Sequence, residues 1–413
     1  MSTPTLQSSL TFPSGARVKN RLMKSAMSEG LATWDNRMTD ALIRLYARWA
    51  DGGVGLLMTG NVMIDRRALG EPGNLVIEDE RDLEMLQEWA TAGSRNNTSF
   101  WMQINHPGKQ AIRSLNTVAY APSAIPFAKD MRAFFAPPKE LSDVEIEDLI
   151  ERFGRTAGIA KKVGFAGVQI HGAHGYLVSQ FLSPKHNQRN DAWGGTAEKR
   201  RRFVLEVYRA MRREVGEEFP VGIKLNSADF QRGGFSENES LELIEALSDA
   251  GIDLIEISGG TYEAPIMMTA DHNRQKASTR AREAYFLDFA ERARNATQTP
   301  LVVTGGFRTA QGMQDALTSG AIDVVGLGRL LAVEPDAPLR ILQNQNPIHH
   351  VKPIRTGIKM VDQRALMEIM WYGRQMRRMG NGEEPKPNES ALKSFAFTLM
   401  EEGWGIFASR RAR

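Results

Sequence analysis

The chain has 413 residues, of which 42% are hydrophobic and 24% charged, a balance typical of a globular protein with a large core. The formal net charge of +3 is small for this length and predicts no nucleic-acid partner. The absence of cysteine excludes disulfides, cysteine-ligated zinc and iron–sulfur clusters. Residues 1–12 lack a signal-peptide pattern, and no apolar run reaches the roughly 20 residues that span a membrane, so we expect a cytoplasmic protein with no membrane partner.

Short apolar runs recur along the chain, and each is followed by a turn and a helix-like segment. Continuous apolar runs are typical of parallel strands that are buried on both faces, whereas half-exposed strands alternate. The predicted strands are Arg21–Ser25, Val54–Thr59, Phe100–Ile104, Val168–Ile170, Val221–Leu225, Leu254–Ile257, Leu301–Thr304 and Val324–Leu327. Eight strand–helix units predict a closed (β/α)8 TIM barrel over residues 1–343.

The segments between these strands carry helix signals at both ends. Ser142 with Glu145, and Ser236 with Glu239, have the spacing of capping boxes that begin a helix. Gly164, Gly251 and Gly320 stand where a helix must end before the next strand. A doubly wound open sheet is the alternative fold, but the dinucleotide fingerprint that it would need does not follow either of the first two strands.

Two stretches lie outside this repeat. We expect residues 259–276 to form a loop over the mouth of the barrel, with Tyr262 as a substrate contact. The tail, residues 344–413, is too rich in methionine and aromatic residues to be disordered. We therefore predict a helical extension that packs on the barrel or on a partner subunit, which makes a homo-oligomer a possibility.

Ligands of (β/α)8 barrels lie at the carboxyl ends of the strands, where His171, His174 and Tyr176 follow the fourth strand. The two imidazoles can donate hydrogen bonds to one oxygen, and the phenol can supply a proton. A metal-dependent hydrolase that uses the histidine pair is an alternative, although no third ligand lies close by in sequence, and we predict no metal. A purely supporting role for both histidines is the other alternative.

The sequence from this point onward resembles that of a known family. His-Gly-Ala-His-Gly-Tyr-Leu from His171, Gln-Phe-Leu-Ser-Pro from Gln180, and Asn-Gln-Arg-x-Asp-x-Trp-Gly-Gly from Asn187 resemble the signature of the old yellow enzymes, which are FMN-dependent NAD(P)H oxidoreductases. The likeness extends from about Asn20 to Pro335. It implies one FMN and either NADPH or NADH as the hydride donor.

The resemblance also implies which residues hold FMN. The residues implied are Ser25, Ala26, Met27, Ser28, Gly60, Gln103, His171, Lys224, Gly305, Gly306, Gly328 and Arg329. Lys224 stands where many relatives have arginine, and its charge suits the negative charge that a reduced flavin carries at N1 and O2. The glycines after the last two strands, with Arg329, suit a single phosphate group.

The expected reaction is a two-stage hydride transfer that ends on an electron-poor alkene, an α,β-unsaturated carbonyl or nitro compound. The resemblance implies that His171 and His174 hold the substrate oxygen and that Tyr176 protonates the α-carbon. A reductase of nitro compounds or nitrate esters, and a decarboxylating or demethylating relative, would use the same site. A flavin-binding module without activity is a further alternative, which the presence of His171, His174 and Tyr176 opposes.

Overall fold

The computed structural model describes residues 3–129, 131–259, 286–351, 353–357 and 366–401. Eight parallel strands close into a barrel in chain order, because the last strand pairs with the first. They are β3 (Leu22–Lys24), β4 (Leu56–Met63), β5 (Ser99–Asn105), β8 (Gly167–Gly172), β9 (Val221–Asn226), β10 (Leu254–Ser258), β11 (Leu301–Thr304) and β12 (Val324–Leu327). The predicted (β/α)8 barrel is confirmed, and each predicted strand overlaps one of these.

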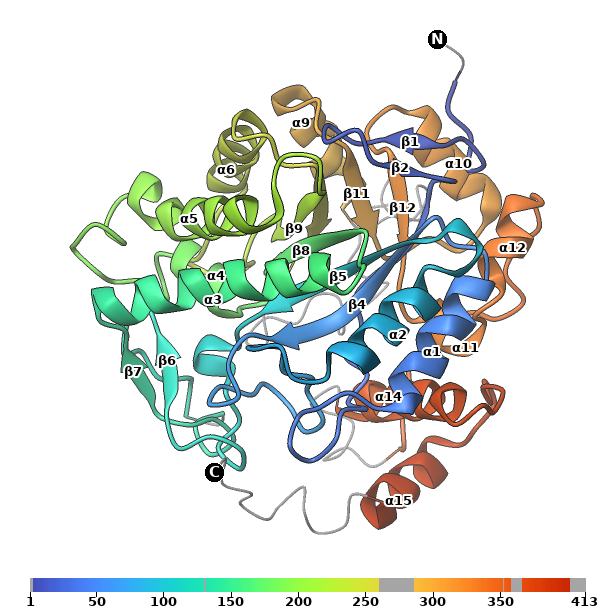
Figure 1. The fold of residues 1–413 in the computed structure, drawn as a ribbon, viewed down its shortest axis with the longest axis horizontal. Coiled ribbons are helices and arrows are strands. Elements are labelled where there is room, and N and C mark those ends of the chain that lie inside the picture. The colour runs from blue at the N-terminus through green and yellow to red at the C-terminus, as the bar shows by residue number, and fades with distance from the viewer. Residues whose placement is uncertain (1–2, 130, 260–285, 352, 358–365, 402–413) are drawn as a thin grey trace.

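Helices surround the barrel (Figure 1). The helices are α1 (Asp40–Asp51), α2 (Leu83–Gly93), α3 (Asp143–Lys162), α4 (Leu177–Leu182), α5 (Ala197–Val215), α6 (Glu237–Asp249), α9 (Leu287–Ala296), α10 (Ala310–Thr318), α11 (Leu330–Val333), α12 (Ala337–Leu342), α14 (Leu366–Gly380) and α15 (Ala391–Glu401). Both predicted capping boxes are present, at the starts of α3 and α6. Gly164, Gly251 and Gly320 all have positive φ, so they end their helices as predicted. No helix in the described part of the chain is both long and apolar enough to cross a membrane.

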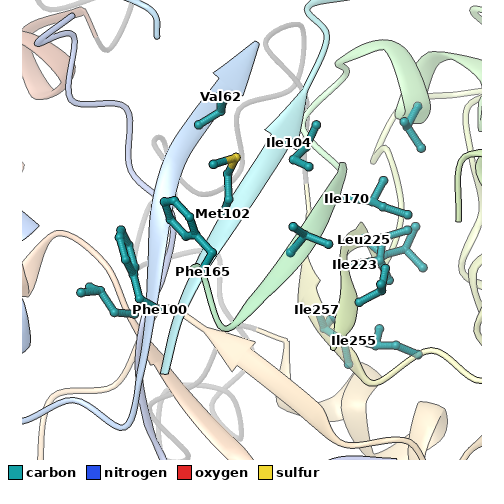
Figure 2. Packing of buried hydrophobic residues seen from close by; sticks show 14 of the residues in the cluster. Val62, Phe100, Met102, Ile104, Phe165, Ile170, Ile223, Leu225, Ile255 and Ile257 are labelled. Atoms are coloured by element: carbon teal, nitrogen blue, oxygen red, sulfur yellow. The ribbon is translucent and has the colours of Figure 1, made fainter. Parts of the chain in front are cut away.

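Side chains alternate between the two faces of each barrel strand. Phe100, Met102 and Ile104 of β5 point outward, into the layer between strands and helices that Figure 2 shows. Between them, Trp101 belongs to a separate apolar cluster with residues of β3, β4 and β10 to β12, which is the cluster inside the barrel. Both faces are therefore buried, as the continuous apolar runs predicted.

The interior of the barrel is apolar at one end and polar at the other. A short hairpin of β1 (Leu10–Thr11) and β2 (Arg17–Val18) covers the amino-terminal end of the barrel, where the ring of Phe12 lies 5.2 Å from that of Trp101. Nearer the carboxyl ends of the strands, the inward positions are polar. The buried polar residues there are Ser25, Gln103, Gln169, His171, Lys224, Glu256 and Thr304. This polar layer identifies the end of the barrel that can bind a ligand.

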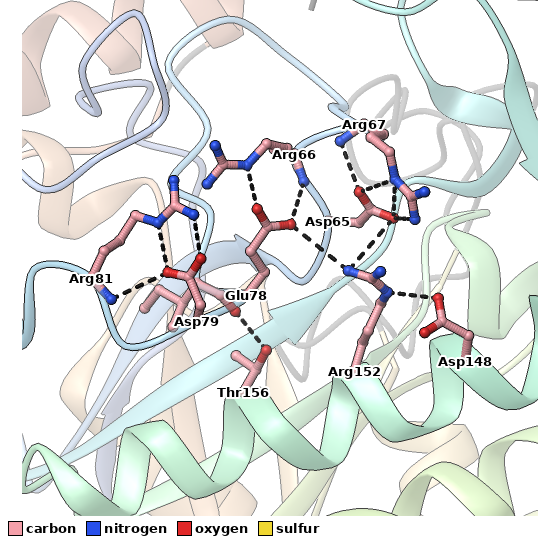
Figure 3. Close-up of polar contacts among 10 residues, drawn as sticks. Asp65, Arg66, Arg67, Glu78, Asp79, Arg81, Asp148, Arg152 and Thr156 are labelled. Atoms are coloured by element: carbon pink, nitrogen blue, oxygen red, sulfur yellow. Dashed lines mark hydrogen bonds and ion pairs between the residues drawn. The ribbon is translucent and has the colours of Figure 1, made fainter. Parts of the chain in front are cut away.

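The loop between β4 and α2 is fixed to α3 by ion pairs (Figure 3). Arg152 of α3 lies 3.8 Å from Glu78, 4.0 Å from Asp65 and 2.8 Å from Asp148. Asp65 is buried and also pairs with Arg67 at 2.7 Å. The loop therefore has a fixed course over the carboxyl end of the barrel.

Helix α14 of the predicted tail packs on the barrel's own helices. It lies against α1 and α11, and the backbone carbonyl of its last residue, Gly380, accepts a hydrogen bond from Arg44 of α1 at 2.7 Å (Figure 1). Trp371, Tyr372 and Met376 join the main hydrophobic core. A division of the chain at residue 343 stays a prediction.

Between β5 and α3, the strands β6 (Ala119–Ala121) and β7 (Pro138–Glu140) form a small parallel sheet of their own.

Candidate functional site

A cavity of about 780 Å³ opens at the carboxyl ends of the barrel strands. Its wall includes nearly all of the residues predicted for the site. From that set the wall has Ser25, Ala26, Met27, Ser28, Gln103, His171, His174, Tyr176, Lys224, Gly305, Gly306, Gly328 and Arg329. A volume of this size is within the range of cofactor and substrate sites.

A tight turn after β8 brings His171, His174 and Tyr176 to the cavity. His174 and Gly175 both have positive φ, 61° and 77°, so the chain reverses within two residues. The N–H of His174 donates to Asn226 Oδ1 at 3.2 Å and its carbonyl accepts from Gln110 at 2.8 Å. These bonds hold the backbone of His174 in a left-handed conformation, which a residue other than glycine adopts only at a cost in free energy.

The signature residues that follow serve as supports for this turn. The buried amide of Gln180 donates to the carbonyl of Gly175 at 2.7 Å and accepts from the N–H of Lys109 at 3.0 Å. Asn187 donates to the carbonyls of Phe181 and Trp193, both at 2.8 Å. The long sequence signature is thus mainly a scaffold around three residues that face the cavity.

The two imidazoles and the phenol are in contact in the cavity wall. The ring of His171 lies 5.2 Å from that of His174 and 4.8 Å from that of Tyr176, each edge to face. Burial lowers the pKa of His174 to about 3, with a smaller effect from Lys224. Burial, then His174 and Lys224, hold the pKa of His171 well below its usual range. Both rings are therefore neutral near pH 7, and each carries one N–H.

The hydrogen bonds indicate which ring nitrogens are available. Nδ1 of His171 accepts the N–H of Ala173 at 3.3 Å, so the ring proton is on Nε2. Nε2 of His174 lies 2.8 Å from Ser258 Oγ, so its other nitrogen is the one that could meet a ligand. Within the described residues, no group of three or more His, Cys, Asp or Glu side chains is placed to hold a metal ion.

The floor of the cavity is a chain of buried polar side chains. Nε2 of Gln103 donates to Gln169 at 2.7 Å, and Nε2 of Gln169 donates to Glu256 at 2.9 Å. Glu256 pairs with Lys224 at 3.1 Å and accepts from the hydroxyl of Thr304 at 2.7 Å. Gln103 and Lys224 line the cavity, whereas Gln169 and Glu256 lie behind them.

The loops after β11 and β12 expose backbone to the cavity. Gly305 and Gly306 have φ of 101° and 93°, and a Cβ on Gly328 would meet no atom within 4 Å. Arg329 follows at the start of α11 and forms an ion pair with Glu368 of α14. Backbone N–H groups that lack side-chain cover, next to a guanidinium, favour an anion with several oxygens.

The carboxyl ends of β3 and β4 add residues that sequence reasoning missed. Ser28 donates to Asn61 at 3.1 Å, and Glu71 of the loop after β4 accepts from Asn74 at 3.2 Å. Burial raises the pKa of the Glu71 carboxyl. Asn61 and Glu71 line the cavity, but they lie between two predicted strands in a stretch with no recognisable motif.

Two predicted positions have a different outcome. Gly60 does not line the cavity, because a Cβ there would lie 2.5 Å from the carbonyl oxygen of Met27 and even closer to the carboxylate of Glu29. The lack of a side chain at Gly60 instead lets the chain after β3 approach closely, and the N–H of Gly60 donates to Glu29 at 2.9 Å. Tyr262 lies outside the described residues.

The wall also includes tail residues that no prediction singled out, namely Pro347, His349, His350, Val351, Pro353, Glu368, Ile369, Tyr372 and Met376.

Comparison with known proteins identifies a family and several relatives. The model of the NADH:flavin oxidoreductase / NADH oxidase family matches residues 10–347. The NADH-dependent flavin oxidoreductase iliE of Hypocrea jecorina is 37% identical over 389 residues, which are 89% of this chain and 94% of that one. The protein of the same name from Neonectria sp. is 38% identical over 351 residues, 80% of this chain but only 46% of that longer protein. The structure of the old yellow enzyme homologue from Zymomonas mobilis has a TM-score of 0.70 and 25% identity, covering 82% of this chain and 93% of that one.

Proposed function

The chain belongs to the NADH:flavin oxidoreductase / NADH oxidase family, the family of the old yellow enzymes, and from this premise we propose that it reduces electron-poor C=C bonds. FMN is the cofactor of this family, and NADH or NADPH supplies the hydride. When bound, FMN accepts a hydride from the nicotinamide and passes it to a second substrate. The alkene as that second substrate, and the role of each residue, are the proposal.

The distribution of polar groups around the cavity supports a single orientation of FMN. Gly305, Gly306, Gly328 and Arg329 would hold the phosphate, because they offer open backbone N–H groups and a guanidinium. Gln103 and Lys224, in the floor of the cavity, would meet the pyrimidine edge of the ring.

The first strand would form the remaining wall of the flavin site. The backbone of Ser25, Ala26 and Met27 would contact the ring, and the hydroxyl of Ser28 would face N5 and O4. Gly60 would act indirectly, because it lets Met27 and Glu29 approach β4 closely.

The observation that carries the alkene proposal is the neutral histidine pair beside Tyr176. Nε2–H of His171 is a hydrogen-bond donor that needs no proton from solvent at neutral pH, and the second nitrogen of His174 is one as well when its Nε2 accepts from Ser258. Donors of this kind stabilise the negative charge that develops on a carbonyl or nitro oxygen when a hydride adds to the β-carbon. Tyr176 would then deliver the proton to the α-carbon.

The Tyr176→Phe variant tests this assignment. It should keep reduction of the bound flavin by NADH or NADPH within about threefold, and lose about 10²–10⁴ in the rate at which 2-cyclohexenone reoxidises it, which is the usual contribution of a general acid. Anaerobic stopped-flow absorbance at about 450 nm separates the two half-reactions, because the absorbance of the flavin itself reports first its reduction and then its reoxidation.

A matched control is Tyr120→Phe, which removes a phenol from β6, away from the cavity wall. Both half-reactions should then keep their rates. Equal loss of both half-reactions in Tyr176→Phe would contradict the proton-donor role. Reoxidation of the wild-type protein by nitrobenzene or a nitrate ester, but not by the enone, would replace the alkene with the nitro-group alternative.

A further inference from the structure

Glu256 is a fully buried carboxylate behind the wall of the cavity. It points into the barrel from β10, and no part of it is exposed. One oxygen, Oε1, lies 3.1 Å from Lys224 Nζ and accepts from Thr304 at 2.7 Å. The other, Oε2, accepts from Gln169 at 2.9 Å. Because the site is enclosed, the charge of this carboxylate acts on its surroundings more strongly than it would in water.

The same carboxylate fixes the orientation of the amides beside it. Glu256 can only accept from Gln169, so the carbonyl oxygen of Gln169 faces Gln103 and accepts its N–H at 2.7 Å. Two of the groups that line the cavity floor, Lys224 and Gln103, are therefore both set by Glu256, one by charge and one by the direction of its amide.

Lys224 by itself would make a bound flavin easier to reduce. Two-electron reduction leaves negative charge at N1 and O2 of the ring, and a nearby cation stabilises that state. An anion 3.1 Å from the cation cancels most of its effect at a distance, because the two together form a dipole without net charge.

We propose that Glu256 is a positioning residue that neutralises Lys224 and so lowers the reduction potential of the bound FMN. The inference rests on the proposed placement of Lys224 beside the pyrimidine edge, and not on the identity of the alkene. A lower potential makes the reduced protein a stronger hydride donor to the second substrate. It also makes reduction by the nicotinamide less favourable, so Glu256 sets the balance between the two half-reactions.

The experiment measures the flavin potential of the holoprotein, without substrate, by equilibration against a reference dye. Glu256→Gln keeps the shape and, through its one amide oxygen, an acceptor for Lys224 and Thr304, but it removes the charge and the acceptor that faces Gln169. It should raise the ratio of reduced to oxidised flavin at a fixed dye potential by about tenfold, which is about 30 mV for a two-electron couple. Sulfite, which binds flavins more tightly when positive charge surrounds the pyrimidine edge, should show a parallel gain in affinity.

A double variant, Lys224→Met with Glu256→Gln, removes both charges and leaves neither unpaired. It should return the ratio to within about threefold of the wild-type value, because the native pair already has no net charge. This variant also keeps the inference testable if Glu256→Gln alone fails to fold.

Asp253→Asn is the matched control. Asp253 is also fully buried and pairs with Arg212 at 3.0 Å, but it precedes β10 at the opposite end of the barrel. Its loss should leave the flavin potential unchanged.

Three outcomes would overturn the inference. An unchanged potential in Glu256→Gln together with a lower one in the double variant overturns the role of Glu256 but retains Lys224 at the flavin. An unchanged potential in both variants overturns the placement of Lys224 as well. A potential that rises equally in Asp253→Asn shows a general effect of removing buried charge.

Discussion

Burial keeps four of the seven histidine side chains of this protein neutral. The pKa of His106 is lowered to about 4, and the pKa values of His174 and His186 to about 3, in each case chiefly by burial. An unfolded chain would protonate the same side chains near pH 6.5. Between pH 6.5 and about 4 the unfolded chain therefore binds more protons than the folded protein, and acid favours unfolding in this window.

The stability of the protein should accordingly fall as the pH is lowered from 7 to 5. In the His106→Asn variant this fall should be smaller, because one buried group no longer gains a proton on unfolding. Asparagine can still accept the N–H of Gly108, which His106 accepts through Nδ1 at 3.1 Å. Urea denaturation at pH 7 and pH 5 measures the difference. An identical loss of stability in the variant and the wild type would contradict the account.

At the scale of single residues, some of the residues of the site could be predicted from the sequence and others could not. His171, His174 and Tyr176 could be predicted because they stand within six residues, directly after a strand. Glu71 could not, because its position in the wall depends on a loop whose course is set by contacts with α3. Glu256 was also missed, since a lone carboxylate inside an apolar run reads as part of a strand and not as part of a site.

Among the elements, the loop between β4 and α2 depends most clearly on distant partners (Figure 3). The side chains of Asp65 and Glu78 are 2% and 14% exposed, and Arg152 of α3 lies within 4.0 Å of both. Arg81 pairs with Asp79 in the same loop, but both of these side chains are about 40% exposed. The buried network and the exposed pair should therefore differ in their effect on stability.

Arg152→Met should lower the free energy of unfolding by about 1–3 kcal/mol, because it leaves two buried or half-buried carboxylates with less compensation. Arg81→Met, the matched control, should cost at most about 0.5 kcal/mol, as solvent screens an exposed pair. Thermal unfolding of both variants measures the contrast. Equal costs would show that the network contributes no more than surface charge.

The elements themselves were the most predictable part of the fold. Apolar runs located the eight strands, and the capping boxes located the starts of α3 and α6, because these signals depend on neighbours in sequence. Part of the polar layer inside the barrel, Gln169 and Glu256, was missed, since isolated polar residues in an apolar run do not show which partners they meet across the barrel. Only the closed barrel brings Gln103, Gln169 and Glu256 into one chain of hydrogen bonds.

For the molecule as a whole, the cofactor should be a large source of stability. A ligand that binds only the folded state at 100 times its dissociation constant adds about 2.7 kcal/mol. Removal of FMN should therefore lower the melting temperature by several degrees, and added FMN should restore it. Hydrogen exchange in α14 should also quicken on removal, because Tyr372 and Met376 line the cavity. Exchange in α6, which contributes nothing to the wall, is the control. An apoprotein whose α14 exchanges no faster than that of the holoprotein would contradict this coupling.

The wall of the cavity draws on the chain from Ser25 to Met376. During synthesis the barrel strands leave the ribosome first, and α14 follows only after the last strand and the helices behind it. Until then Arg329 has no Glu368 beside it, and this part of the cavity wall is incomplete. A nascent chain can thus close its barrel before the wall of its cavity is complete, because the last part of that wall comes from the tail.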